Sequence, residues 1–142
     1  MKRKTKKLLF SDLYVGYSDQ FERTVTSAMI VRFAKLSGDM NPLHICNDYA
    51  KRTEFKKPVA HGMLTASFFS ALVGMLLPGE KALYLSQEIR FRRPVFARDR
   101  LTVSGKVIAM NDSLNLLEIE TAIRRKGNIV VSGIAKVKMR TT

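Results

Sequence analysis

The residues best suited to chemistry in this sequence lie in two short stretches, at residues 39–44 and at His61. Asp39 and His44 supply a carboxylate and an imidazole within one loop, and Gly62 precedes a long apolar segment. Adding water to a carbon conjugated to a thioester requires a base for the water, an acid for the neighbouring carbon and a donor for the enolate oxygen. Asp39 and His44 could move the protons, and the free N–H of Gly62 at a helix start could bind the oxygen. The same groups could run the reverse dehydration.

Each of these residues also has a purely structural interpretation. Asp39 followed by Asn41 and Pro42 is typical of a turn, in which the Asp and Asn side chains bond loop amides. A histidine that precedes a glycine, as His61 does, is commonly a residue that bonds locally where a helix begins. The joint pattern, and no single residue, favours a catalytic site.

The elements that must position these residues are a short helix before the loop and a long helix after it. Thr26 or Ser27 can cap the first helix, and Gly38 can end it. The second helix is predicted over residues 63–77, ending at a Pro-Gly pair. Because this helix has almost no charged face, we expect it to be buried.

The second half of the chain has the pattern of β-strands. Residues 81–93, 100–110, 113–125 and 128–140 form strand-like segments, and turn residues separate the last three. Residues 20–24 predict a short edge strand. An antiparallel sheet that curls around the buried helix satisfies both patterns, which predicts an α+β fold. Because such a sheet has open edges, we expect two copies to pair as a homodimer.

Length and composition set bounds on the class of protein. The 142 residues, 46% of them hydrophobic, predict a single domain over residues 1–142 with a sizeable core. No apolar run reaches the roughly 18 residues of a membrane-spanning helix, so we expect no membrane partner. The net charge of +13 favours an acidic partner, such as nucleic acid, anionic lipid, a phosphorylated cofactor or an acidic carrier protein. A general basic bias that aids solubility accounts for the charge equally well.

The N-terminus and the single cysteine bear on the cellular compartment. Residues 1–7 are basic and are predicted to be a disordered tail, followed by too short an apolar stretch for a signal peptide. Cys46 has no second cysteine with which to form an internal disulfide, which fits a reducing compartment. We therefore expect a cytoplasmic protein.

At the level of motifs, the sequence resembles the MaoC-like hydratases and, within them, the (R)-specific enoyl-CoA hydratases. The spacing from Asp39 to His44 and on to the His61-Gly62 pair carries the resemblance, which covers roughly residues 15–107. The matching runs are SGDMNPLH at 37–44, FKKPV at 55–59, AHGMLTAS at 60–67, LPG at 77–79, YLSQ at 84–87, RF at 90–91 and PV at 94–95.

The resemblance implies a hot-dog fold, in which the sheet wraps around the helix at residues 63–77, and it implies dimers or larger assemblies. It implies that Asp39 and His44 form a dyad that activates water for syn addition to a trans-2-enoyl thioester. The product would be the (R)-3-hydroxyacyl thioester. No metal or separate cofactor is implied, because the substrate carries its own coenzyme A or acyl carrier protein.

The resemblance also implies supporting roles around the dyad. It places the Gly62 amide at the thioester carbonyl. It places Ser70, on the buried helix, near the dyad as a hydrogen-bond partner. Asn41 and His61 would support the same site.

Two positions depart from the family pattern. Relatives commonly carry an acidic residue two positions after the catalytic histidine, where this chain has Cys46, with Asp48 further on. A Gly-Asp pair often opens the next strand, where this chain has Arg98 and Asp99. Neither position belongs to the dyad, so we expect both to tune the site without abolishing activity.

A cluster of arginines follows the predicted helix. Alternation along a strand would put Arg90 and Arg92 on one face and Arg93 on the other. These three could contact the phosphates of coenzyme A, or an acidic carrier, at the mouth of an acyl tunnel. They could equally be a solvated strand edge that charge protects from aggregation.

Two other functions fit parts of the pattern. Hot-dog folds also host acyl thioesterases, but those sites generally use one carboxylate and a helix amide without the Asp-x-Asn-Pro-x-His loop. A non-catalytic module that binds acyl thioesters or nucleic acid would suit the basic charge. No aromatic RNA-binding motif, helix-turn-helix pattern or zinc-ligand spacing supports nucleic acid as a partner.

Overall fold

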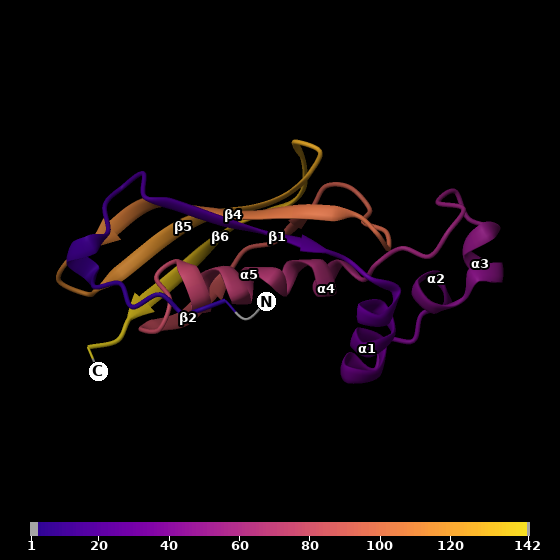
Figure 1. The fold of residues 1–142 in the computed structure, drawn as a ribbon, viewed down its shortest axis with the longest axis horizontal. Coiled ribbons are helices and arrows are strands. Elements are labelled where there is room, and N and C mark those ends of the chain that lie inside the picture. The colour runs from indigo at the N-terminus through magenta and orange to yellow at the C-terminus, as the bar shows by residue number, and fades with distance from the viewer. Residues whose placement is uncertain (1–2, 142) are drawn as a thin grey trace.

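The computed structural model describes residues 3–141, which form an antiparallel sheet with a helix packed against one face (Figure 1). The strands are β1 (Ser18–Thr24), β2 (Ala82–Gln87), β3 (Arg90–Phe91), β4 (Arg100–Asn111), β5 (Leu116–Arg125) and β6 (Asn128–Met139). Their order in the sheet is β1-β4-β5-β6-β2, and β3 also pairs with β6. The expected α+β architecture is confirmed.

Alternation of apolar and polar residues explains why the central strands bury one face of the sheet. Leu101, Val103 and Val107 of β4 are fully buried, and alternate residues between them, Thr102, Ser104 and Lys106, face the other side of the sheet. Val103 lies opposite Ile123 of β5, and Val107 lies opposite Ile119. Neighbouring strands therefore present their apolar residues to the same face, where the helix covers them.

The prediction of one strand over residues 81–93 is wrong, because the strand is interrupted between β2 and β3. Glu88 leaves the regular ladder, although its N–H still donates to Ile134 O at 2.9 Å. The chain runs so close to β6 here that a Cβ on Gly133 would lie 1.7 Å from Glu88 O. The close backbone contact fixes the break, and the regular strand resumes for only two residues, ending at Phe91.

The long apolar segment is helical, as expected, but it is not one continuous α-helix. Its consecutive pieces are α4 (Gly62–Ala66), α5 (Phe68–Ala71) and a π-helical turn, η2 (Leu72–Leu76). Ser67 separates the first two, because its hydroxyl donates to Leu64 O at 2.5 Å and tightens the turn. Leu77 N–H then donates to Leu72 O at 2.9 Å, which gives the wider π-helical spacing.

Two apolar clusters join this helical segment to the sheet. Phe69 and Leu72 pack in one cluster with residues such as Ile123 of β5. Val73 and Leu77 belong to the other, further from the start of α4. The helical segment is therefore buried, as its sequence predicts, and the start of α4 is held in a fixed position.

Three shorter helices lie beyond one end of the sheet (Figure 1). They are α1 (Ser27–Ser37), α2 (Pro42–Ile45) and α3 (Asn47–Lys51). The predicted limits of the first are confirmed, since Thr26 Oγ1 accepts from Met29 N at 3.1 Å and Gly38 ends the helix with φ of +82°. The predicted loop at residues 39–44 is partly helical, because Pro42 begins a turn that carries His44.

The N-terminal segment is ordered in the part that the structure describes. Of the predicted disordered tail, residues 1–2 lie outside the described residues. Lys6 N donates to Met75 O, and Lys6 O accepts from Glu80 N, both at 2.9 Å. Lys6 Nζ also bonds Asp19 Oδ2 at 2.5 Å, which raises the pKa of Lys6 above its ordinary value. The prediction of disorder is therefore wrong for residues 5–7, because the Thr5 hydroxyl and the backbones of Lys6 and Lys7 bond the chain at the end of η2.

A short 3-10 turn, η1 (Phe10–Asp12), connects this segment to β1. Among the helices of residues 3–141, none is long and apolar enough to cross a membrane.

Candidate active site

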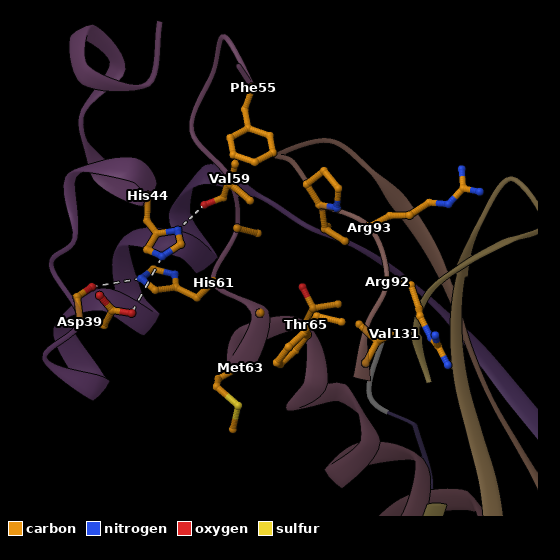
Figure 2. A pocket seen from close by; sticks show the side chains of 15 residues that line it. Asp39, His44, Phe55, Val59, His61, Met63, Thr65, Arg92, Arg93 and Val131 are labelled. Carbon is orange, nitrogen blue, oxygen red and sulfur yellow. Dashed lines mark hydrogen bonds and ion pairs between the residues drawn. The ribbon is translucent and has the colours of Figure 1, made fainter. Parts of the chain in front are cut away.

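The chain after α1 and the short helix α2 bring Asp39 and His44 together (Figure 2). Asp39 Oδ2 lies 3.9 Å from His44 Nε2. The Asp39 side chain is 49% exposed and that of His44 is 14% exposed, so the carboxylate lies on the solvent side of the imidazole. A gap of 3.9 Å is too long for a direct hydrogen bond and short enough for one water to bond both atoms.

A backbone carbonyl fixes which nitrogen of His44 carries the proton. His44 Nδ1 lies 2.6 Å from Val59 O. Because a carbonyl oxygen can only accept, Nδ1 carries the hydrogen and donates it. In the neutral ring, Nε2 therefore presents a lone pair toward Asp39 and the cavity, which is the state that a general base requires.

The second histidine, His61, contacts both residues of the dyad. His61 is 2% exposed, and its Nε2 donates to Asp39 O at 3.0 Å. The His44 and His61 rings stack with centroids 4.0 Å apart, and Phe33 packs on His61 at 4.9 Å. His61 therefore contacts both the Asp39 backbone and the His44 ring, and its supporting role in the reaction stays a prediction.

Asn41 shapes the loop between the two dyad residues. Its N–H donates to Asp39 Oδ1 at 3.1 Å, and its Oδ1 accepts from Leu43 N at 3.0 Å. The Asn41 carbonyl accepts from His44 N at 2.9 Å. One carboxylate oxygen of Asp39 is thus occupied by the loop, which leaves Oδ2 to face His44.

A cavity of about 470 Å³ opens beside the dyad. The lining contributed by Val59, Ala60, Val95 and Val131 is apolar and buried. Gly62, Met63 and Phe91 complete the side at the start of α4. A mainly apolar cavity with a carboxylate and an imidazole at one side suits an acyl group whose reacting carbon lies at the mouth.

The start of α4 places Gly62 in the lining of this cavity. As the first residue of the helix, Gly62 has an N–H without a partner inside the helix. A Cβ at this position would lie 2.8 Å from Phe91 Cε1, so the glycine allows the Phe91 ring to lie against the helix start. The predicted oxyanion donor and the dyad thus border the same cavity.

One polar lining residue was not anticipated from the sequence. Thr65, one turn after His61, lines the cavity and is 1% exposed, and among the described residues its hydroxyl has no hydrogen-bond partner. The spacing of four from His61, which puts both residues on one helix face, is the signal that could have identified it.

Ser70 is not brought to the dyad within this chain. It lies on α5 with an exposed side chain and is absent from the cavity lining. The supporting role that the resemblance implies for Ser70 therefore stays a prediction.

The arginines do not follow the simple alternation that the sequence predicts. Regular pairing ends at Phe91, so Arg92 and Arg93 leave the strand, and both line the cavity. Arg90, still in β3, lies opposite Ser132 of β6 and does not line it. The prediction that Arg93 lies apart from the other two is wrong, because all three border a second hollow on the sheet.

The two departures from the family pattern lie outside the dyad. Cys46 is half-buried and joins α2 to α3. Arg98 adopts φ of +77°, the left-handed conformation that favours glycine, beside Asp99, whose carboxylate accepts from Phe96 N at 2.9 Å. The turn therefore keeps a glycine-like backbone although it carries an arginine.

Asp39, His44 and His61 are also the described residues that come nearest to a metal-binding set, with ligand atoms within 4.8 Å of one another. The geometry does not suit a metal ion. The two imidazoles are stacked, so their lone pairs do not converge on one point, and His61 Nε2 is already a donor to Asp39 O. The absence of a metal from the function stays a prediction.

The fold and this site together define a hot-dog protein with a carboxylate–imidazole pair at the start of its central helix. The family model described as "MaoC like domain" matches residues 16–128. An (R)-specific enoyl-CoA hydratase of Aeromonas caviae is 38% identical over 128 residues, covering 89% of this chain and 96% of the relative. A 3-hydroxybutyryl-CoA dehydratase of Methylorubrum extorquens is 35% identical, covering 93% and 84%.

Solved structures agree with the sequence relatives. An (R)-hydratase of A. caviae involved in PHA biosynthesis superposes with a TM-score of 0.87 at 38% identity, over 90% of this chain and 98% of that one. This chain belongs to the MaoC-like family, and the hot-dog fold implied by its sequence is confirmed.

Proposed function

We propose that this protein hydrates trans-2-enoyl thioesters to (R)-3-hydroxyacyl thioesters and catalyses the reverse dehydration. The relatives named as (R)-specific enoyl-CoA hydratase and 3-hydroxybutyryl-CoA dehydratase support the reaction class. The observation that carries the proposal is the gap between Asp39 Oδ2 and His44 Nε2, together with the carbonyl that fixes the His44 tautomer.

The geometry leads to a mechanism with one water. A water about 2.8 Å from both atoms donates one hydrogen to His44 Nε2 and the other to Asp39 Oδ2. As His44 takes its proton, the oxygen attacks C3 of the enoyl group and the C2–C3 π electrons move toward the thioester oxygen. The Gly62 N–H and the positive end of the α4 dipole stabilise that developing negative charge.

The second half of the reaction returns the proton. The protonated His44 lies on the same side of the substrate as the attacking water, so it delivers its proton to C2 from that side. The enolate collapses to the thioester, and no other reactant is required. Addition is therefore syn, and the dehydration follows the same steps in reverse.

We further infer that the protein is a cytoplasmic homodimer acting on acyl groups carried by coenzyme A or acyl carrier protein. Exposed apolar residues on the edge strand β2, Leu83 and Leu85, support pairing with a second copy. The exposed position of Ser70 is compatible with a contact across that pairing.

The test uses a short trans-2-enoyl thioester and follows both the conjugated absorbance and the release of free thiol. We expect the absorbance to fall without thiol release. Asp39→Asn and His44→Ala should each lower kcat by about 10²-fold or more, the range for general acid–base groups. Asp48→Asn, which removes an exposed carboxylate on α3, is the matched control and should retain activity.

Two outcomes would contradict the proposal. Near-wild-type hydration by either dyad variant would remove the assigned roles. Thiol release in step with loss of the enoyl thioester would indicate a thioesterase.

A further inference from the structure

Hydroxyl groups in the helical segments of this chain can be satisfied by a carbonyl of their own turn. Ser37 Oγ donates to Phe33 O at 2.7 Å, and Ser67 Oγ donates to Leu64 O at 2.5 Å. Thr65 of α4 differs from both, because its hydroxyl has no hydrogen-bond partner in the part of the chain that the structure describes. A local bond is therefore available to helical hydroxyls here, and Thr65 does not make one.

The burial of Thr65 makes its unpaired hydroxyl unusual. Thr65 is almost fully buried, and the carbonyl one turn earlier, His61 O, accepts from Thr65 N at 3.2 Å and not from the hydroxyl. A buried hydroxyl without a partner costs free energy, so native structures rarely keep one. The group is best explained by a partner that the folded chain does not itself supply.

Thr65 lies beside the proposed oxyanion donor. It follows Gly62 by three residues, so the two share one face of the helical turn, and a helical side chain leans toward the N-terminus of its helix. Both residues line the catalytic cavity. Figure 2 shows the Thr65 hydroxyl directed from α4 toward the side of the cavity that Val59 and Arg93 form. The hydroxyl and the Gly62 amide therefore border the same part of the cavity.

The hydroxyl can meet a ligand in the cavity without a change of fold. Threonine in a helix has two favoured χ1 rotamers, so rotation about one bond turns Oγ1 at the cavity wall. The neighbouring side chains of Val95 and Val131 are buried and apolar, and they offer no acceptor. The acceptor that the proposed substrate brings next to Gly62 is its thioester oxygen.

We propose that the Thr65 hydroxyl donates a second hydrogen bond to the thioester oxygen, beside the Gly62 N–H, and that Thr65 is therefore a catalytic residue. This inference rests on the proposed function. The oxygen gains negative charge as water adds to C3, so a donor aimed at it binds the transition state more strongly than the substrate. The proton stays on Thr65 Oγ1 throughout, and no bond to Thr65 is made or broken.

The surroundings of Thr65 make such a donor effective. In a buried, mainly apolar wall the hydrogen bond to a charged oxygen is stronger than it would be in water. A hydroxyl that is not engaged by His61 O has its hydrogen free for the ligand. The position is therefore one at which a single oxygen atom has a large effect on the reaction.

The test compares Thr65→Val, which keeps the shape and removes the hydroxyl, with Thr65→Ser, which keeps the hydroxyl. With crotonyl-coenzyme A, Thr65→Val should lower kcat about 10²-fold, the loss expected for one oxyanion donor, and should change KM much less. Thr65→Ser should recover most of that kcat. Ser67→Ala is the matched control: it removes an exposed hydroxyl outside the cavity lining and should keep the wild-type kcat.

Denaturant unfolding separates this role from a structural one. Because the Thr65 hydroxyl has no partner in the described chain, Thr65→Val should leave the stability unchanged or raise it. Ser67→Ala removes a bond that is formed, so it should lower the unfolding midpoint. A Thr65→Val variant that loses both kcat and stability would overturn the inference, as would one that keeps the wild-type kcat.

Infrared spectroscopy of a bound thioester supplies a measurement that does not depend on turnover. The probe is butyryl-coenzyme A with ¹³C at the thioester carbonyl, which has no double bond to hydrate. Hydrogen bonds to a carbonyl lower its stretching frequency, so the band should move to higher wavenumber in Thr65→Val and stay at the wild-type position in Thr65→Ser and Ser67→Ala. An identical band in Thr65→Val and the wild type would overturn the inference. If the wild type does not hydrate crotonyl-coenzyme A, the proposed function fails, and the carbonyl band still decides whether Thr65 contacts a bound thioester.

Discussion

The sheet with its buried helix and the segment of α1–α3 are stabilised in different ways. In the sheet, β4, β5 and β6 bury an apolar residue at nearly every second position, and Phe69 and Leu72 fill the space above them. In the α1–α3 segment, α1 buries Ile30 and Ala34, and α2 buries nothing. The two dyad residues, Asp39 and His44, lie on the second, sparsely buried region, whereas Gly62 begins the buried helix.

A few specific bonds join the two regions near the site. His61 Nε2 donates to Asp39 O, and His44 Nδ1 donates to Val59 O. Val59 N in turn donates to Leu43 O at 3.1 Å. Stability therefore comes mostly from the sheet and helix, whereas the geometry of the dyad depends on individual polar contacts. Stability and activity should therefore respond to different substitutions.

The largest effect on stability is expected from the core. Leu72→Ala should lower the free energy of unfolding by about 2–5 kcal/mol, because Leu72 is fully buried and its removal leaves a cavity. Leu36→Ala, in the α1–α3 segment, is the matched control. Leu36 is 85% exposed, so its loss should change stability by less than about 0.5 kcal/mol. Equal losses of unfolding free energy in the two variants, measured by denaturant unfolding, would show that the two regions contribute equally to stability.

The bond between the regions can be tested at His61. His61→Leu removes the donor to Asp39 O, so the loop loses a hydrogen bond worth about 1 kcal/mol, and kcat should fall about tenfold as the dyad loses its alignment. His61→Gln, which can place an amide donor near the same carbonyl, should recover part of that loss. Equal kcat values for the two variants would remove the positioning role from this bond.

A smaller effect is expected at the turn before β4. Arg98 has φ of +77°, a conformation that costs a non-glycine residue about 1 kcal/mol. Arg98→Gly should therefore raise the free energy of unfolding by about 0.5–1 kcal/mol, measured by denaturant unfolding. Ala97→Gly, at an adjacent position without a positive φ, should lower the free energy of unfolding. An increase at that position would show that the gain at Arg98 does not come from its positive φ.

The last effect concerns Tyr84 in β2 and is confined to high pH. Burial raises the pKa of Tyr84 to about 12 from its ordinary value of 10.0. Because the folded-state pKa is the higher one, the stabilisation is fully present below about pH 10 and is lost as the pH rises toward 12. The loss should be about 1 kcal/mol, since the ring is only partly buried. Tyr84→Phe should remove this part of the pH dependence, and activity near neutral pH should not change.

Local signals in the sequence were sufficient for much of the fold. Thr26 and Gly38 mark the ends of α1 because capping depends on residues within one turn. The alternation in residues 100–110 fixes which face of β4 is buried. Asp39, His44 and Gly62 could be proposed as one site because they are close in sequence and their residue types are complementary in chemistry.

The features that were missed depend on residues far apart in the chain. The break between β2 and β3 requires Gly133, which β6 contributes. The ordering of residues 5–7 depends on Met75, Gly79 and Glu80. The second hollow combines arginines of β3 and β5 that no local pattern connects.

The stacked pair of His44 and His61 has a practical consequence for spectroscopy. The chain contains two histidines, and both belong to the site. An imidazole ¹⁵N spectrum of the intact, uniformly labelled protein therefore reports on the reaction centre alone, with no background to subtract. The wild-type chain thus carries its own probe for following proton position while a thioester occupies the pocket.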